Sequence, residues 1–252
     1  MLALTQTPSL RMDLGVRTYV GRTEIDFSRA LDQHAEYCRL LAGCGAAVRV
    51  LETNAHFPDG VFLEDTAVVL DEVAIVASMG TSARRGELPG IELVLREYRE
   101  VERIELPALL EGGDVLRIDR KLLVGLSDRT DAAGIAALAA LAGRYGYSLA
   151  TAVARGCLHL KTACTALPDG RLLVNPDWLD AAALKGSEWI AVPEQEPWGA
   201  NVLLIGDQVL LPAAHERTAA LVAQLGFTPR SVDISEFTKA EGGVTCLSLL
   251  LA

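Results

Sequence analysis

The chain has 252 residues, of which 50% are hydrophobic and 22% are charged, so we expect a globular protein with a substantial buried core. Its formal net charge of −10 argues against nucleic acid or an anionic membrane surface as the main partner. No apolar run approaches the roughly 20 residues that a membrane-spanning helix needs. The opening MLALTQTPSLR also lacks the basic start and long apolar run of a signal peptide.

Five cysteines at irregular spacing do not suggest a disulfide framework, which favours reduced thiols and a cytoplasmic protein. Linkers and shifts in composition are absent from the sequence, so we expect one domain over residues 1–252. Cys157 and His159 share one face of a predicted strand but lack the second spaced pair that a structural zinc site requires. We therefore expect neither a metal nor a cofactor.

The predicted elements begin with a strand at RTYVG (17–21) and an amphipathic helix over 26–45 that ends at Gly43 or Gly45. Hairpins are predicted where two apolar strands flank a turn that contains Asp. They are EDTAVVLDEVAIVAS (64–78), GGDVLRIDRKLLVGLS (112–127), KTACTALPDGRLLVNP (161–176) and ANVLLIGDQVLLPA (200–213). Two further helices are predicted at 129–146, started by Asp131, and at 215–227, stopped by Gly226, with short strands after them at 148–154 and 228–232.

The hairpins recur at intervals of roughly 40 to 50 residues, the spacing of propellers and related circular arrays. They start near Glu64, Gly112, Leu160 and Ala200, and a fifth candidate starts at Gly242. We expect the N-terminal strand and helix to complete that fifth unit. Pairing of the last strand with the first would close an α/β ring and hold the C-terminal segment inside the molecule; an ordinary α/β sheet without repeats is the alternative.

In such a ring the hairpin starts converge on the central axis, and several of them carry reactive side chains. Cys246 and His159 suggest a nucleophile with a proton-transfer partner, and Glu111 would orient the imidazole. The adjacent pair Glu64 and Asp65 would suit a guanidinium group, because carboxylates bind this planar cation through parallel hydrogen bonds. Arg84 and Arg129 lie elsewhere in the sequence and would hold the carboxylate of the same ligand, so the inferred ligand resembles arginine.

Six segments, in this order, resemble the dimethylarginine dimethylaminohydrolases. They are FPDGVFLEDTA, TSARRGE, LEGGDVL, LSDRTDAAG, CLHLKTA and EGGVTCLSL. The resemblance runs from Asp59 to Leu249 and implies the pentein fold, an α/β propeller of five ββαβ-type units around a pseudo-five-fold axis. These enzymes belong to the guanidino-group-modifying superfamily.

The resemblance also implies a role for each matching residue. Cys246 would be the nucleophile, His159 the general acid and base, and Glu111 the carboxylate that hydrogen-bonds His159. The substrate-binding residues would be Glu64 and Asp65 at the guanidinium, Arg84 and Arg129 at the α-carboxylate, Asp59 and the Ala240 carbonyl at the amino-acid end, and Phe62 at the pocket wall.

The implied reaction cleaves the guanidino C–N bond of an Nω-methylated L-arginine to citrulline and an alkylamine through a covalent thiouronium on Cys246. Protonated His159 and the bound cation would both lower the pKa of the thiol. The implied partner is therefore a small guanidino amino acid, and a homodimer is compatible with the sequence.

Two features depart from the family pattern. The N-terminal lid usually carries a Leu over the substrate, and Leu14 is the candidate here; bulky Trp198 precedes the fourth hairpin. Arginine deiminase or another guanidine hydrolase on the same scaffold is one alternative, although the sequence lacks the helical domain that arginine deiminases usually add. A pentein-fold binding protein without catalysis is another, but it would not need Cys246, His159 and Glu111.

Overall fold

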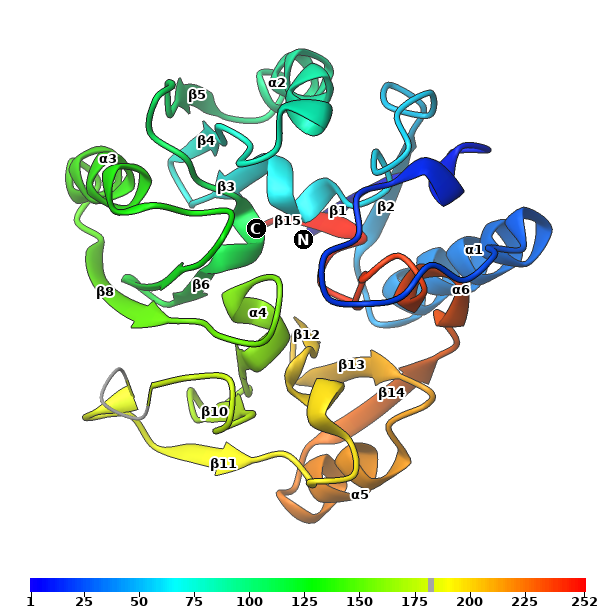
Figure 1. Ribbon diagram of the computed structural model, residues 1–252. Helices are drawn as coiled ribbons and strands as arrows, with labels where there is room; N and C mark the ends of the chain where they lie inside the picture. Colours follow the sequence, from blue (N-terminus) through cyan, green and yellow to red (C-terminus); the bar gives the residue numbers. More distant parts are fainter. Residues whose placement is uncertain (181–183) are drawn as a thin grey trace.

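The computed structural model describes residues 1–180 and 184–252, and the strands in these residues form five three-stranded sheets around a central axis (Figure 1). In chain order the sheets are β15-β1-β2 (Ser248–Leu251, Leu2–Gln6, Ala47–Leu51), β3-β4-β5 (Ala67–Val69, Val73–Val76, Glu100–Arg103), β6-β7-β8 (Val115–Ile118, Lys121–Leu126, Ser148–Val153), β9-β10-β11 (Cys164–Ala166, Leu172–Val174, Trp189–Ala191) and β12-β13-β14 (Leu203–Ile205, Gln208–Pro212, Thr228–Val232). The fold is the expected α/β pentein propeller, and each of the four expected hairpins forms.

Each sheet has the same pairing pattern. The first strand pairs with the middle strand antiparallel and the third pairs with it parallel. A parallel neighbour requires a crossover connection. Helices on the outside of the ring provide it in four units: α1 (Phe27–Gly43), α2 (Leu88–Leu95), α3 (Ala132–Gly143) and α5 (Glu216–Gln224).

The helix boundaries follow from the local sequence. The side chain of Asp26 accepts a hydrogen bond from Arg29 N at the start of α1, and Asp131 does the same for Gly134 N at the start of α3. Beyond the ends of α1 and α5, Gly45 and Gly226 have φ of 96° and 90°, a conformation that glycine adopts without steric cost. Asp131 and Gly226 therefore act as expected, and Gly45 rather than Gly43 provides the left-handed turn after α1.

The strand expected at residues 17–21 is wrong. These residues form no strand, and the strand that completes the fifth sheet is β1, which pairs antiparallel with β15 and parallel with β2. Ala3 to Gln6 are buried in this central strand, whereas Thr18 and Tyr19 are exposed. The last strand does pair with the first, so the ring closes, but through Leu2–Gln6.

Helix α2 was not expected from the sequence. The segment LPGIELVL is almost entirely apolar and contains Gly90, so it shows little of the alternation of polar and apolar faces that identifies an amphipathic helix. It forms a helix because Ile91 and Leu95 are fully buried against the second sheet.

Short helical turns precede the first strands of four sheets and bring their starts toward the axis. They are the turns Leu63–Thr66, Gly112–Asp114 and Pro197–Ala200 and the four-residue helix α4 (Leu160–Ala163).

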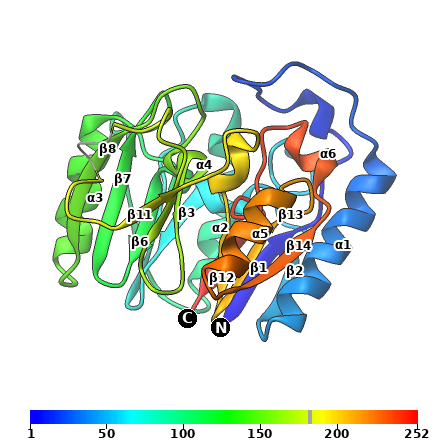
Figure 2. The same cartoon turned by 90° about the horizontal axis from the view of Figure 1, so that it is seen from below.

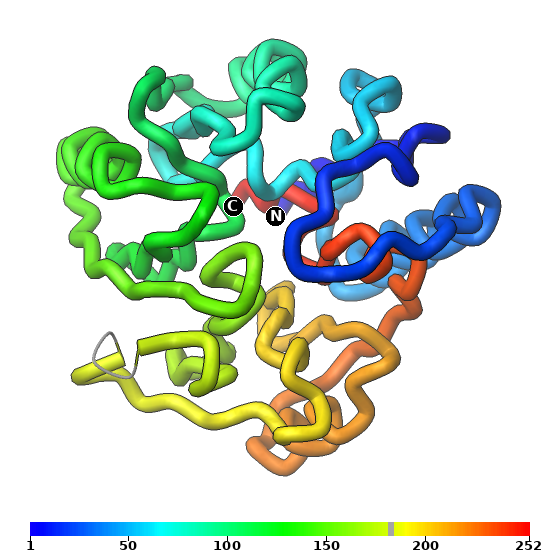
Figure 3. The backbone as a smooth tube through the Cα atoms, in the orientation of Figure 1, coloured from blue at the N-terminus to red at the C-terminus, as the bar shows by residue number. Residues whose placement is uncertain are grey.

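In Figure 2 the two chain ends lie at one face of the ring, whereas α4 and α6 (Ser235–Thr238) lie toward the other face. The N-terminal segment after β1 reaches that second face (Figure 2), and Figure 3 shows it passing near the last part of the chain. Within the residues described, no helix has the length and apolarity to span a bilayer.

Candidate active site

Cys246 lies in the turn before β15, and close packing holds this turn in place. Its carbonyl accepts a hydrogen bond from Glu64 N at 3.2 Å, and its Sγ lies 3.3 Å from the amide of Gly243. A Cβ at Gly242 would lie 2.3 Å from the ring of Phe62, and one at Gly243 would lie 2.2 Å from Asn201 Oδ1. The glycine pair is therefore needed because other side chains approach the backbone too closely for any larger residue.

His159 precedes α4 and is buried against two acidic side chains. Its Nε2 donates to Glu111 Oε2 at 2.8 Å, and its Nδ1 lies 3.6 Å from Asp65 Oδ1. The second oxygen of Glu111 accepts the amide of Gly80 at 3.0 Å, which fixes the carboxylate. Burial alone would favour the neutral ring, but the negative charges of Asp65, Glu111 and Asp114 raise the pKa of His159 to about 9. The imidazole is therefore protonated at neutral pH.

In the protein without substrate, the pKa of the Cys246 thiol is raised above its ordinary value. Burial raises its pKa to about 12, and the negative charges of Glu64 and Asp65 add to this effect. The hydrogen bond from Gly243 N and the charge of Lys161 oppose the rise but do not offset it. In the protein without substrate the thiol is therefore neutral at physiological pH.

The carboxylate of Asp65 lies beside His159 and Cys246, and its two oxygens have different surroundings. Its Oδ2 forms a buried ion pair with Arg84 Nη1 at 2.5 Å, while its buried Oδ1 has no hydrogen-bond partner among the residues that the structure describes. Arg84 also donates to Glu87, at 2.9 to 3.2 Å, and to the carbonyls of Phe62 and Asp59. Most of the donors of Arg84 are thus committed to the protein, and the guanidinium positions Asp65.

Eight of the ten expected site residues line one pocket, which also receives the N-terminal segment. They are Asp59, Phe62, Asp65, Arg84, Arg129, His159, Ala240 and Cys246. Glu111 stands behind His159 and is completely buried. The pocket has a volume of only about 20 Å³, so its lining residues leave little free space in it.

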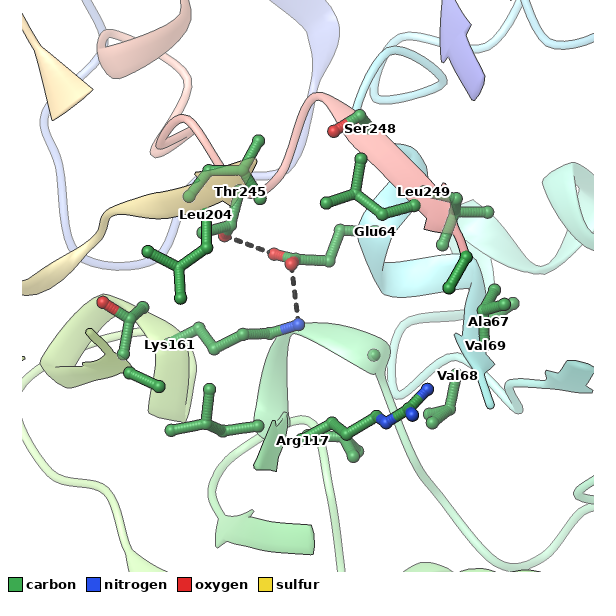
Figure 4. A pocket seen from close by; sticks show the side chains of 18 of the residues that line it. Glu64, Ala67, Val68, Val69, Arg117, Lys161, Leu204, Thr245, Ser248 and Leu249 are labelled. Atoms are coloured by element: carbon green, nitrogen blue, oxygen red, sulfur yellow. Dashed lines mark hydrogen bonds and ion pairs between the residues drawn. The ribbon is translucent and has the colours of Figure 1, made fainter. Parts of the chain in front are cut away.

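Glu64 is the expected residue that the structure places elsewhere. Its carboxylate lines a separate cavity of about 370 Å³, where Lys161 Nζ lies 2.6 Å from Oε1 and Thr245 Oγ1 donates to Oε2 at 2.5 Å (Figure 4). Met1 and Ala252 also line this cavity, so it opens toward the face that carries the chain ends. Asp65, and not the pair Glu64 and Asp65, faces the pocket of Cys246.

The sequence analysis did not identify Val16, Leu158 or Glu241, which also line the pocket. Leu14, the expected lid residue, is 62% exposed and lies outside it, whereas Val16 N donates to Asp59 Oδ2 at 3.1 Å and so brings Val16 over the pocket. The sequence signal was an apolar residue beside Gly15, but Leu14 before this glycine and Val16 after it fit that signal equally well. A Cβ at Gly15 would lie 2.3 Å from Asp59 Oδ1, which shows how closely this loop approaches the site.

Ligand atoms of Asp65, Glu111 and His159 all lie within 4.8 Å of one another, a spacing that a metal ion could bridge. The three groups are already neutralised by protein partners. Arg84 pairs with Asp65, and Arg129 Nη1 lies 3.6 Å from Glu111 Oε1, so a cation would compete with both guanidinium groups. Protonated His159 would also have to lose its proton to act as a ligand.

The chain resembles known proteins over nearly its whole length. Residues 17–181 match the family model described as N,N dimethylarginine dimethylhydrolase, eukaryotic. The N(G),N(G)-dimethylarginine dimethylaminohydrolase of Streptomyces coelicolor is 39% identical over 99% of this chain and 96% of its own length. The protein of that name from Pseudomonas aeruginosa is 34% identical over 98% and 97%. A Pseudomonas aeruginosa structure of a cysteine-to-serine variant with citrulline superposes with a TM-score of 0.91 at 32% identity, covering 98% of this chain and 97% of the other. Together with the propeller fold and the site formed by Cys246, His159 and Glu111, these matches show that the chain belongs to the dimethylarginine dimethylaminohydrolase family.

Proposed function

We propose that this protein hydrolyses Nω-methylated L-arginine, either asymmetric dimethylarginine or monomethylarginine, to L-citrulline and dimethylamine or methylamine. The observation that carries the proposal is the buried Oδ1 of Asp65, which accepts no hydrogen bond from the described residues, faces the same pocket as Cys246 and lies 3.6 Å from His159 Nδ1. A guanidinium group would supply the hydrogen bonds that this oxygen lacks.

At the other end of the pocket, the charged groups suit an amino acid. Arg129 would bind the α-carboxylate, and Asp59 with the backbone carbonyl of Ala240 would bind the α-amine. Arg84 would act mainly through Asp65, since its other donors are occupied by Glu87 and by two backbone carbonyls. Phe62 would form the apolar wall.

The protonation states suggest how the reaction starts. The substrate cation would offset the negative charges that hold the Cys246 thiol neutral, so binding would favour release of the thiol proton to solvent. His159 is already protonated and would keep its proton for a later step. The nucleophile would thus form only when substrate is present.

The thiolate would attack the guanidinium carbon and form a C–S bond, giving a tetrahedral adduct. Cleavage of the bond to the alkylated nitrogen would release the amine, which takes the proton from His159. Neutral His159 would then accept a proton from water as its oxygen adds to the thiouronium carbon. That proton restores the imidazolium, and the C–S bond then breaks as the remaining hydroxyl proton passes to the departing Cys246 sulfur, which gives citrulline and the free thiol.

Residues 1–252 would form one catalytic domain that works without a cofactor. The protein would act in the reducing cytoplasm, which would keep Cys246 as a thiol. A homodimer is compatible with this function and can be tested by sedimentation.

Product analysis tests the reaction directly. Purified protein is incubated in parallel with asymmetric dimethylarginine, monomethylarginine and arginine, and products are identified by mass spectrometry. Cys246→Ser should give none, while Cys44→Ser, which removes a thiol at the end of α1 away from the pocket, should retain wild-type turnover. Ammonia from arginine, without citrulline from either methylated substrate, would assign the protein to the arginine deiminase alternative.

A further inference from the structure

Glu241 makes a set of hydrogen bonds that the proposed reaction does not use. Its carboxylate accepts the backbone amides of three successive residues: Thr18 at 2.9 Å, Tyr19, and Val20 at 2.8 Å. These residues are more than 220 positions away in the sequence. Three amides directed at one carboxylate form a concave anion site, and each bond is strengthened by the full charge of the acceptor.

The backbone around Glu241 holds this carboxylate in a defined position. Glu241 has φ of 66°, the left-handed conformation that a residue with a side chain rarely adopts. Its amide donates to Thr238 O, and the amide of the next residue, Gly242, donates to Phe237 O. The strained turn therefore joins α6 to the glycine pair that precedes Cys246 and aims Glu241 at residues 18–20.

Other contacts between the N-terminal segment and the body of the protein are mainly polar, and in one of them Lys239 Nζ donates to the carbonyl of Glu24 at 3.0 Å. Arg129 Nη2 donates to Thr18 Oγ1 at 3.2 Å, and Tyr19 Oη donates to Asp128 Oδ2 at 3.0 Å. Residues 21–24 are exposed, so little apolar burial holds this stretch. A segment stabilised by a few polar bonds opens at low free-energy cost, and loss of one acceptor has a large effect on that cost.

The segment must open for a ligand to enter. Val16 lines the pocket and the remaining volume of about 20 Å³ is too small for an amino acid of arginine size. Asp59 and Arg129, the groups proposed to bind the amino-acid end, both hydrogen-bond the segment in the closed form. Substrate would take over these two groups, whereas Glu241 can hold residues 18–20 in both the empty and the occupied closed states.

We infer that Glu241 is a positioning residue, a latch that holds the N-terminal segment closed over the pocket through the amides of Thr18, Tyr19 and Val20. This inference rests on the proposed function for its catalytic consequence, since closure would exclude water while the thiouronium forms. The latch itself is a property of the protein without substrate.

Amide hydrogen exchange tests the latch without requiring any activity. In Glu241→Gln the amide group offers one uncharged acceptor in place of two charged oxygens, so we expect the amides of residues 18–20 to exchange at least tenfold faster than in the wild type. Asp128→Asn is the matched control: it weakens only the bond from Tyr19 Oη and should change exchange at residues 18–20 far less. Unfolding midpoints of both variants should match the wild type, because the amides of Thr18 and Tyr19 can bond to water.

Steady-state kinetics with the active substrate test the consequence. Because Glu241 holds the segment in both the empty and the occupied closed states, its loss lowers both closure equilibria by the same factor, so KM and kcat should both stay nearly unchanged while closure remains favoured. Unchanged amide exchange in Glu241→Gln would overturn the latch whatever the substrate. Faster exchange in a protein that turns over no guanidine would keep the latch and reject the proposed function. A fall in kcat at constant KM with normal exchange would instead place Glu241 in the chemistry.

Discussion

Lys161 Nζ lies 2.6 Å from Glu64 Oε1 at the inner end of the larger cavity, and both side chains are nearly buried. Figure 4 shows the ammonium group pointing at the carboxylate, whose second oxygen accepts from Thr245. Glu64 also donates its amide to the Cys246 carbonyl, so this ion pair stands directly behind the turn that carries the thiol. Burial raises the pKa of Glu64 even though Lys161 and Thr245 oppose the rise, so the carboxylate depends on these partners to stay ionised.

Lys161→Met should be strongly destabilising, because it leaves a buried carboxylate without its cation. We expect a loss of about 3–5 kcal/mol in the free energy of unfolding, measured by urea denaturation. The double variant Glu64→Gln/Lys161→Met removes both charges and should recover much of this loss. If the single and double variants lost equal amounts, the pair would contribute by packing and not by charge.

Reactivity of Cys246 should increase steeply with pH in the protein without substrate. The thiol pKa is raised to about 12, so the thiol is protonated below this value and the thiolate fraction rises about tenfold per pH unit. Alkylation by iodoacetamide, followed by mass spectrometry of the Cys246 peptide, should therefore still accelerate from pH 8 to pH 10. A plateau below pH 8 would contradict the raised pKa.

The variant Glu64→Gln provides the matched comparison for the pH dependence of Cys246 alkylation. The negative charge of Glu64 is one cause of the raised thiol pKa, and the variant leaves Lys161 nearby as an uncompensated cation. Alkylation of Cys246 should then reach a given rate at lower pH than in the wild type. A shift in the opposite direction would mean that packing around Glu64 controls access to the sulfur.

Arg84 and Arg129 should behave differently although both line the pocket. Arg84→Met removes a buried cation from Asp65 and Glu87 and should cost about 3 kcal/mol or more of stability. Arg129→Met breaks a looser contact, 3.6 Å to Glu111, and should cost less stability while raising KM at least tenfold. Urea denaturation and steady-state kinetics on both variants separate the two roles, and equal stability losses would contradict the distinction.

Several features could be predicted from the sequence because they depend on local pattern. Apolar strands around Asp-containing turns indicated each hairpin, Asp131 indicated the start of α3, and the regular spacing indicated a closed ring. Helix α2 and β1 could not be recognised in this way. Helix α2 is almost entirely apolar, and β1 buries the polar Thr5 and Gln6 beside Ala3 and Leu4, so neither has the alternation that marks its type, and burial decides its conformation.

Cys246, His159 and Asp65 were indicated by residue type and position, since such side chains at equivalent repeat positions converge in a ring. Asp59, Phe62 and Ala240 were implied only by the family resemblance. Which oxygen of which acid faces the pocket was decided only by the tertiary structure. Adjacent residues such as Glu64 and Asp65 point in different directions from one turn, so one carboxylate meets Lys161 and the other meets Arg84. The protonation of Cys246 and His159 and the bonds of Glu241 to residues 18–20 likewise depend on groups distant in sequence, because electric fields and hydrogen bonds act through space.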